Sequence, residues 1–145
     1  NEPSHHIPYL YSWTDEPWKT QYWIREIMNR MYRNNIDGLC GNDDCGQMSA
    51  WYVLAACGLY PVCPGDTRYE ISSPVFEKTE IQVGEGNTFI IRANRNTPEN
   101  TYIQSAKLNG TDYTRCYLDY RDIMKGGVLE LEMGPEPNTN WGVNN

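Results

Sequence analysis

The residues best suited to chemistry lie in the short segment 38–51, which reads GLCGNDDCGQMSAW. Asn42, Asp43 and Asp44 place several hard oxygen atoms at consecutive positions between glycines. Such oxygens suit Ca²⁺ or Mg²⁺, and a carboxylate can also act as a general base that takes a proton from water. The alternating spacing of an EF-hand loop is absent. The segment therefore indicates either a cation site or an acid–base site.

The same acidic pair also has a purely structural explanation. Asp44 stands three residues before Gln47, and this spacing is typical of a capping box at the start of a helix. In that case Asp44 caps the helix that follows, and Asp43 is solvated. Spacing alone favours the structural explanation over a reactive site, so both alternatives remain open at this point.

A second candidate site opens the chain, where the carboxylate of Glu2 precedes His5 and His6 in the sequence NEPSHH. A carboxylate beside two histidines could form a metal site or an acid–base site. Adjacent helical residues point in different directions, so His5 and His6 cannot easily face one ion. The alternative is one buried, hydrogen-bonded histidine and one exposed histidine, and the spacing favours this alternative.

The five cysteines do not form an obvious framework. Their odd number argues against a complete set of disulfides. Cys40 and Cys45 flank the acidic pair and could form a small disulfide staple. Cys57 and Cys63 could join them in a zinc site, but the C-x4-C and C-x5-C spacings fit zinc poorly. We therefore expect free, mostly buried thiols.

Helices must position both candidate sites. Apolar residues recur at helical spacing over 18–33, which predicts an amphipathic helix. Residues 46–58 predict a helix that is apolar nearly all round and ends at Gly58, and such a helix belongs inside a layered helical structure. A short helix is also expected before Pro17. Because two or three helices cannot cover every side of 46–58, we expect it to pack against helices that this chain lacks or against another chain.

The rest of the chain favours β-structure. After a linker at 61–67, short runs of strand formers alternate with Gly, Asn, Pro and Asp, and Asn109-Gly110 is a strong hairpin signal. These patterns predict an α+β chain with a helical part at 1–60 and a small antiparallel β-sheet or sandwich at 68–145. The expected strands are 80–83, 88–93, 102–108, 113–118 and 128–132.

Composition narrows the functional classes. The formal net charge of −7 disfavours nucleic acid as a partner and suits a chain that holds a cation. No apolar run reaches the roughly 18 residues of a membrane-spanning helix. Five Trp and eleven Tyr against two Phe fit a core beside a wet cleft, as in many sugar-binding sites and in ordinary cores. The chain begins with Asn rather than Met, which suggests a piece of a longer protein.

Several blocks of the sequence resemble, in the same order, the C-terminal part of the calcium-dependent α-mannosidases of glycoside hydrolase family 92. These enzymes remove terminal mannose from α-mannosides, such as mannose-rich glycans, with inversion of configuration. The matching blocks are NEPSHHIPYLY at 1–11, KTQ at 19–21 with Ile24-Arg25, the segment 38–51, GLYPVCPG at 58–65 and YIQSAKLNG at 102–110.

The resemblance implies a role for each acidic residue. Asp44 would be the general base that activates water, with Asp43 as its neighbour in the catalytic group. Glu2 and Asp44 would contact the Ca²⁺ ion, which is thought to bind sugar hydroxyls and help to distort the ring.

The resemblance also implies which residues contact the sugar. His5, His6 and Asn42 would line the substrate site, and the histidines would not be ligands of Ca²⁺, which prefers oxygen. Asn42 stands where the family often has a second Asp.

Other parts of the machinery would lie outside this chain. An inverting glycosidase needs a second carboxyl group about 6.5–9.5 Å from the base, and the family's general acid lies in a block upstream of Asn1. The family has an N-terminal β-sandwich and an (α/α)6 barrel, and residues 1–60 would be the last helices of that barrel.

The rest of the same enzyme would then be the partner of this chain. We expect the isolated chain to be inactive and the intact enzyme to be periplasmic or secreted in a bacterium. The rival hypothesis is a β-rich carbohydrate-binding or interaction module, whose helical start serves only for packing.

Overall fold

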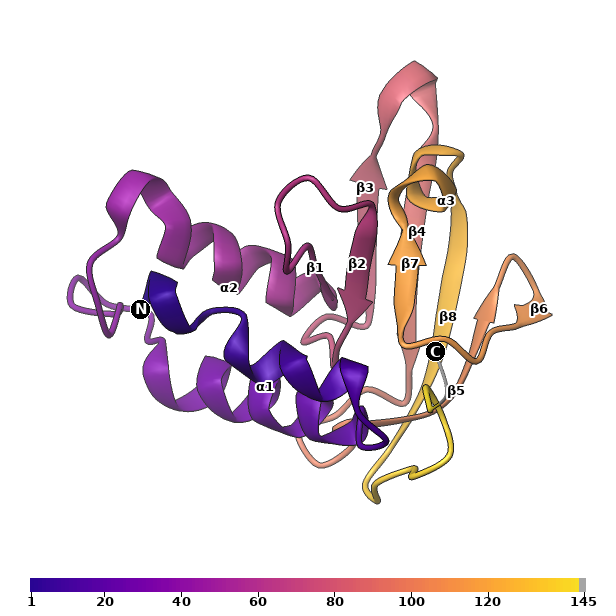
Figure 1. Cartoon of the computed structure of the whole chain (residues 1–145), viewed down its shortest axis with the longest axis horizontal. Coiled ribbons are helices and arrows are strands. Elements are labelled where there is room, and N and C mark those ends of the chain that lie inside the picture. Colours follow the sequence, from indigo (N-terminus) through magenta and orange to yellow (C-terminus); the bar gives the residue numbers. More distant parts are fainter. Residues whose placement is uncertain (144–145) are drawn as a thin grey trace.

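A helical layer lies beside two small β-sheets (Figure 1). The computed structural model describes residues 1–143. The helical elements are η1 (Glu2–Ser4), η2 (Ile7–Trp13), α1 (Trp18–Met31), η3 (Asp44–Gly46), α2 (Gln47–Cys57), η4 (Gly84–Gly86) and α3 (Tyr120–Met124). The strands are β1 (Leu59–Tyr60), β2 (Arg68–Ile71), β3 (Lys78–Gln82), β4 (Thr88–Asn94), β5 (Tyr102–Leu108), β6 (Thr111–Asp112), β7 (Tyr117–Asp119) and β8 (Gly127–Gly134).

The two long helices confirm the helical pattern of the sequence, since α1 and α2 fall within the predicted ranges. The segment before Pro17 differs from the single short helix that we expected. It forms two 3₁₀ helices, in which Tyr9 N–H donates to the carbonyl three residues earlier, at 3.0 Å. Pro8 lacks the N–H that a continuous α-helix would need at that position, so the chain breaks into two short pieces.

The strands form a five-stranded sheet in the order β3-β4-β8-β5-β6 and a three-stranded sheet in the order β1-β2-β7. The prediction of an antiparallel β part is wrong for the central pair, because β4 and β8 are parallel, with Ile91 opposite Leu129. The chain makes β5, β6, β7 and α3 between them, and this long connection lets β8 enter beside β4 in the same direction. Side-chain periodicity reports which face of a strand is buried, and it carries no information on strand direction.

The Asn109-Gly110 turn is confirmed. It joins β5 to β6, and both residues have positive φ angles of 52° and 81°, as a tight two-residue hairpin turn requires. Asn109 Oδ1 also accepts a hydrogen bond from Val128 N–H at 2.8 Å. The expected strand at 113–118 is shorter and later than predicted, since only Tyr117–Asp119 forms β7.

Two hydrophobic clusters organise these elements. The β core lies between the two sheets and takes alternate residues of β4 and β8, including Phe89, Ile91, Leu129 and Leu131, and Leu118 from β7. The helical core gathers Tyr9, Ile24, Met28, Trp51, Ala55, Ala56 and Tyr60. The chain is therefore a mixed α+β structure with two sheets.

Two buried polar side chains of α1 connect the helical layer to the β-sheets. Gln21 Oε1 accepts a hydrogen bond from Ile103 N–H of β5 at 2.8 Å. Arg25 donates to Ser73, both to its carbonyl and to its hydroxyl, and to the carbonyl of Pro74. Buried polar groups are stable only when they are hydrogen-bonded, so these contacts fix how α1 sits on the sheets.

One side of α2 is open to solvent. Met48, Trp51 and Ala55 are buried against the helical core, whereas Val53 is 59% exposed. Ser49 and Ala50 are also exposed, so this side carries no charged residue. The sequence predicted that this apolar helix would lack partners within the chain, and the open side agrees with that expectation.

The cysteines depart from the prediction of mostly buried thiols. Cys40, Cys45 and Cys63 are exposed and free, so the staple between Cys40 and Cys45 is absent. Cys57 is half-buried, and Cys116 is buried with its thiol 3.4 Å from Ser12 O. The three exposed thiols lie outside both hydrophobic clusters, Cys45 in η3 and the other two in loops. Within residues 1–143, no helix is both long and apolar enough to cross a bilayer.

Candidate functional site

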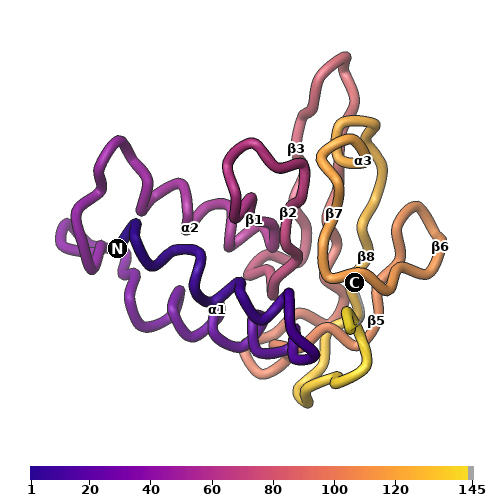
Figure 2. Tube along the Cα trace, viewed as in Figure 1, coloured from indigo at the N-terminus to yellow at the C-terminus, as the bar shows by residue number. Residues whose placement is uncertain are grey.

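The N-terminal turn and the acidic loop (residues 38–46) meet at one end of the helical layer. The chain start lies beside the connection between α1 and α2 (Figure 1, Figure 2). A Cβ added at Gly41 would lie only 3.0 Å from Asn1 Oδ1, so glycine allows this close approach. The two candidate sites of the sequence are therefore neighbours in the fold.

Asp43, and not Asp44, holds the first turn of α2. Its Oδ1 accepts from Ser49 N–H at 3.0 Å, and its Oδ2 accepts from Ser49 Oγ at 2.7 Å. These hydrogen bonds lower the pKa of the Asp43 carboxyl. The predicted Asp44 cap is wrong because Cys45 and Gly46 take positive φ angles of 53° and 76°. The chain turns there, which leaves Asp43 near the helix N-terminus.

Asp44 and Asn42 are both exposed, and Asp44 begins the short helix η3. Within residues 1–143, the Asp44 side chain makes no hydrogen bond or ion pair. The two adjacent carboxylates thus have different environments. Asp43 has both of its oxygens engaged by Ser49, and Asp44 presents its carboxylate to solvent.

Glu2 carries a buried oxygen without a partner. Its Oε1 is shielded from solvent and accepts no hydrogen bond from residues 1–143. The negative charge of Glu2 acts on two nearby groups, because it favours the charged form of His5 and disfavours ionisation of Tyr32. A desolvated carboxylate oxygen is unfavourable unless a cation or a donor meets it. Glu2 is therefore the described residue whose surroundings most require a ligand.

The two histidines have different environments, as the structural alternative for NEPSHH proposed. His5 is 7% exposed, whereas His6 is exposed. The Nδ1 of His5 lies 3.4 Å from Gln47 Nε2, and its Nε2 lies 3.2 Å from Met48 Sδ. Burial lowers the pKa of His5, which favours the neutral ring. Both ring nitrogens are thus occupied by residues of α2.

Stacked aromatic rings form the floor beneath the N-terminal turn. The rings of His5 and Trp51 stack at 5.3 Å, and Tyr32 stacks on Trp51 at 5.7 Å. Trp51 Nε1 donates to His5 O at 3.1 Å, and the Tyr32 hydroxyl donates to Met48 O at 3.3 Å. Burial raises the pKa of Tyr32 well above its usual range, so its hydroxyl keeps its proton.

Sequence reasoning missed Tyr32, Gln47 and Met48 as parts of this site. Gln47 entered only as a capping residue, and Tyr32 only as the end of a helical pattern. Their contacts with His5 and Trp51 join residues far apart in the chain, which local spacing cannot reveal. The excess of Tyr and Trp over Phe was the one signal in the sequence for such a ring cluster.

A calcium ion would find only part of a coordination shell among the described residues. The carboxylate oxygens of Glu2 are donors of the type that Ca²⁺ prefers, and the unpartnered Oε1 fits such a role. Residues 1–143 contain no group of three or more His, Cys, Asp or Glu side chains that could hold a metal ion. Most donors of a complete site would therefore have to come from elsewhere.

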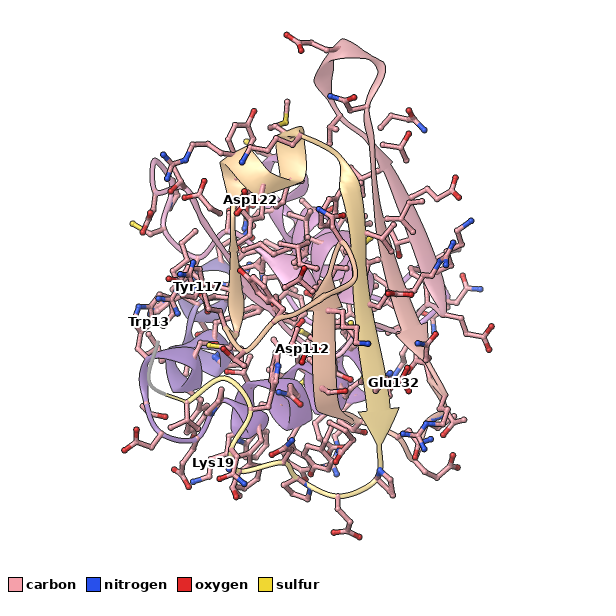
Figure 3. All side chains as sticks on the ribbon, turned by 90° about the vertical axis from the view of Figure 1, so that its right-hand side faces the viewer. Trp13, Lys19, Asp112, Tyr117, Asp122 and Glu132 are labelled. Atoms are coloured by element: carbon pink, nitrogen blue, oxygen red, sulfur yellow. The ribbon has the colours of Figure 1, made fainter. Side chains whose placement is uncertain are left out.

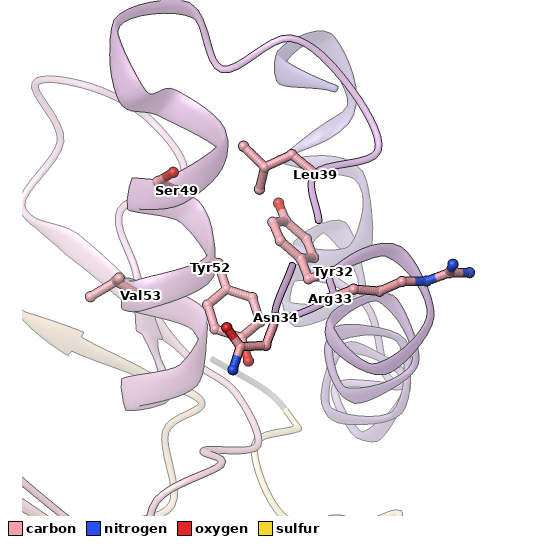
Figure 4. A pocket seen from close by; sticks show the side chains of 7 residues that line it. All are labelled: Tyr32, Arg33, Asn34, Leu39, Ser49, Tyr52 and Val53. Carbon is pink, nitrogen blue, oxygen red and sulfur yellow. The ribbon is translucent and has the colours of Figure 1, made fainter. Parts of the chain in front are cut away.

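An open pocket of about 490 Å³ lies next to Ser49, the residue that binds the Asp43 carboxylate. Ser49 and Tyr52 of α2 form one wall, and Tyr32 and Leu39 form the facing wall (Figure 4). Arg33 points away from the pocket in this view. Glu2 and Asp44 do not line the pocket, so it is separate from the meeting point of the N-terminal turn and the acidic loop.

Comparison with known proteins supplies the context of this site. The profile of the "Glycosyl hydrolase family 92 catalytic domain" matches residues 1–135. The solved structure of the family GH92 α-mannosidase BT3965 from Bacteroides thetaiotaomicron is similar, with a TM-score of 0.94 and 44% sequence identity. The match covers 99% of this chain and 19% of that one.

Two further relatives are also glycosidases. The structure of the family GH92 inverting mannosidase BT2199 from the same organism has a TM-score of 0.93 and 44% identity, over 99% of this chain and 20% of that chain. An uncharacterized secreted glycosidase from Arthroderma benhamiae is 36% identical, over 99% of this chain and 19% of its own length. The chain thus spans about a fifth of the length of these relatives. It belongs to glycoside hydrolase family 92, within the catalytic domain of that family.

Proposed function

We propose that this chain forms part of an exo-acting, inverting, calcium-dependent α-mannosidase that removes terminal α-linked mannose from mannose-rich glycans. The family assignment supports a glycoside hydrolase, and two similar solved structures are those of mannosidases. In this proposal residues 1–60 complete the helical barrel and residues 68–145 form the β segment beside it. The secreted glycosidase from Arthroderma benhamiae supports a secreted enzyme. A periplasmic or secreted location in a bacterium stays a prediction.

The observation that carries the proposal is the difference between the two loop carboxylates. Asp43 is fixed by Ser49 through both of its oxygens. Asp44 is exposed beside it and can accept a proton from water. We therefore assign Asp44 as the general base and Asp43 as the residue that positions the loop. If Asp44 served only as a helix cap, its carboxylate would face the α2 N-terminus, as Asp43 does.

The reaction needs one water and two carboxyl groups. Asp44 takes a proton from the water while the water oxygen bonds to the anomeric carbon of mannose. The bond to the leaving oxygen breaks, and a general acid outside this chain gives that oxygen a proton. The product is β-mannose, and the two carboxyl groups stand about 6.5–9.5 Å apart to admit the water.

The sugar and the cation would contact the residues around the base. We propose that one carboxylate oxygen of Glu2 coordinates Ca²⁺, and that the bound ion would in turn bind sugar hydroxyls. Asp44 as a second ligand stays a prediction. His6 and Asn42 are exposed and could reach a sugar, whereas the buried ring of His5 could contribute mainly by position.

The missing components would come from the rest of the same enzyme. The open, uncharged side of α2 around Val53 is suited to packing against further helices. The general acid and most Ca²⁺ donors would come from the same source. For this reason we expect residues 1–145 alone to release no mannose.

The central test uses the intact enzyme that contains this sequence. Asp44→Asn should lower kcat on an α-mannobioside by roughly 10²–10⁴-fold, the usual contribution of a general base. Asp43→Asn should cause a smaller loss, because it weakens the loop and leaves the base in place. Equal activity of Asp44→Asn and wild type would refute the assignment.

Two controls separate this proposal from a non-catalytic carbohydrate-binding module. Proton NMR of the first product should show β-mannose, and an α product would contradict inversion. A calcium chelator should abolish turnover, and restored Ca²⁺ should recover it. A binding module would retain mannan binding in Asp44→Asn and show no turnover in the wild type.

A further inference from the structure

Gln47 is the first residue of α2 and follows the acidic loop directly. Its side-chain nitrogen lies 3.4 Å from His5 Nδ1 and 3.3 Å from the hydroxyl oxygen of Tyr60. A carboxamide nitrogen carries two hydrogens, so it can donate to both acceptors at once. This side chain therefore connects three segments, namely the N-terminal turn, the start of α2 and β1.

The same contacts define which nitrogen of His5 carries the proton. Nδ1 must accept, because the Gln47 nitrogen can only donate. The proton of a neutral His5 then lies on Nε2, which faces the Met48 sulfur at 3.2 Å. A thioether sulfur is a weak acceptor and offers no hydrogen. Both ring nitrogens are therefore satisfied in one tautomer.

The opposite orientation of the Gln47 amide is less favourable. Its oxygen would then face Nδ1 and require a proton there. Nε2 would lose its proton and would face Met48 Sδ, which has no hydrogen to donate. A buried acceptor would remain unsatisfied, which is unfavourable. The hydrogen-bond pattern thus favours a single arrangement of Gln47 and His5.

The position of His5 determines the position of Glu2. The carbonyl of Glu2 accepts from His5 N–H at 3.2 Å, which closes the turn η1. The ring of His5 is held by Gln47 and stacks on Trp51, while its carbonyl accepts from Trp51 Nε1. The main chain and the ring of His5 are thus both fixed to α2, three residues after Glu2.

From these contacts we infer that Gln47 is a positioning residue, which locks the His5 tautomer and so holds the Glu2 turn against the acidic loop. The Gln47 side chain makes no hydrogen bond to Glu2 or Asp44, although the Gln47 main-chain N–H donates to the Asp44 carbonyl. The side chain acts through His5 and the start of α2. The consequence for catalysis rests on the proposed function, whereas the tautomer does not. This difference allows the two claims to be tested separately.

The direct test is nitrogen NMR of the histidine rings in the intact enzyme, with the His5 and His6 signals assigned from their loss in His5→Asn and His6→Asn. Exposed His6 is the internal reference for free tautomer exchange. At about pH 8, above the ordinary pKa of histidine, His5 should show a protonated Nε2 and an unprotonated Nδ1. His6 should show averaged signals. Averaged signals for His5 as well would overturn the inference.

Substitution of Gln47 sharpens this test. In Gln47→Glu the new carboxylate cannot donate, so His5 should gain a proton on Nδ1. The matched control is Gln82→Glu on exposed β3, which should leave both histidine spectra unchanged. Tyr60→Phe should also keep the wild-type His5 pattern, since the Gln47–His5 bond remains. An unchanged His5 spectrum in Gln47→Glu would contradict the proposed lock.

The activity test uses the intact enzyme. Gln47→Met should lower kcat by about 10–100-fold, as is typical when a supporting hydrogen bond is removed, with a small change in KM. Gln82→Met should behave as wild type. Undiminished kcat in Gln47→Met would refute the positioning role. If the wild-type enzyme itself lacks mannosidase activity, the proposed function fails while the tautomer result still decides the role of Gln47.

Discussion

One serine gives the two adjacent carboxylates of the acidic loop their different properties. Ser49 supplies both its N–H and its hydroxyl to Asp43. A carboxylate at a helix N-terminus is stabilised both by such hydrogen bonds and by the helix dipole. The Asp44 side chain, one residue later, receives no such hydrogen bond within residues 1–143. The loop therefore uses one acid to build its shape and leaves the other available for reaction.

This arrangement predicts a pH-dependent stability. The folded state lowers the pKa of Asp43 below its ordinary value of 3.8, so Asp43 stabilises the fold above that pH. The stabilisation is lost as the pH falls through the lower pKa of the folded state. We expect Asp43→Asn to unfold at a lower temperature than wild type at neutral pH.

The difference in Tm between Asp43→Asn and wild type should shrink below about pH 4, where the wild-type carboxylate also becomes protonated. Tryptophan fluorescence during heating would measure it. The same substitution at exposed Asp37, outside the cap, controls for the loss of one negative charge. A constant difference between neutral and strongly acidic pH would contradict this account.

At the residue scale the sequence reversed the structural roles of Asp43 and Asp44. The Asp44–Gln47 spacing suggested a capping box, which assumes a regular approach to the helix. The left-handed conformations of Cys45 and Gly46 break that regularity. A non-glycine residue at positive φ is uncommon, so no spacing rule would anticipate Cys45 in this conformation.

At the scale of elements, α2 ends as sharply as it begins. Gly58 takes a φ of 90°, and its N–H donates to the carbonyls of Ala55 and Leu54. Its own carbonyl accepts from Ser72 N–H at 2.9 Å, which leads the chain toward the three-stranded sheet. Gly58 therefore both stops the helix and attaches it to the segment after β2.

The left-handed conformation of Gly58 predicts how a methyl group added at this position changes the stability of the fold. Gly58→Ala should destabilise the fold by about 1–2 kcal/mol for the left-handed backbone alone. The new Cβ would also lie 3.0 Å from Pro74 Cβ, which adds a further penalty. Urea unfolding would measure the change in the free energy of unfolding.

Gly65→Ala is the matched control for that measurement. Gly65 has nearly the same φ, 91°, and a Cβ added there would meet nothing within 4 Å. It should incur only the conformational cost. Equal destabilisation by the two substitutions would show that the contact with Pro74 has no energetic effect.

Helices and most strands were predictable from sequence because their periodicity is local. The expected strands 88–93 and 128–132 lie within β4 and β8. Their parallel pairing was not predictable, since it depends on the path of the chain between them. The single short helix expected before Pro17 is replaced by η1 and η2, and Pro8 lies in the first turn of η2.

On the scale of the whole molecule, one arginine of the three-stranded sheet contacts the helical layer. Arg68 of β2 pairs with Glu70, which is fully buried. The guanidinium lies over the rings of Trp13, at 4.4 Å, and Tyr117, at 3.9 Å. Figure 3 shows Trp13 and Tyr117 near each other, on η2 and β7. Arg68 thus connects η2, β2 and β7.

Removal of this cation should be costly. Arg68→Met leaves the Glu70 charge buried without its partner, and such losses typically destabilise by about 3–5 kcal/mol. Glu70→Gln in the Arg68→Met background should recover part of that loss, because no uncompensated charge remains. Chemical denaturation of wild type, single and double variants would measure both steps. A double variant no more stable than Arg68→Met would contradict this explanation.

The contacts from Gln21 and Arg25 to the β segment have a consequence for recombination. Gln21 binds the main-chain N–H of Ile103, and Arg25 binds the main-chain carbonyls of Ser73 and Pro74. Main-chain atoms are the same whatever side chains the strands carry. The β segment of one family member should therefore be exchangeable for that of another, as long as the recipient helix keeps its Gln and Arg. Chimeric enzymes could carry many substitutions in the strands and still keep these hydrogen bonds between α1 and the β segment.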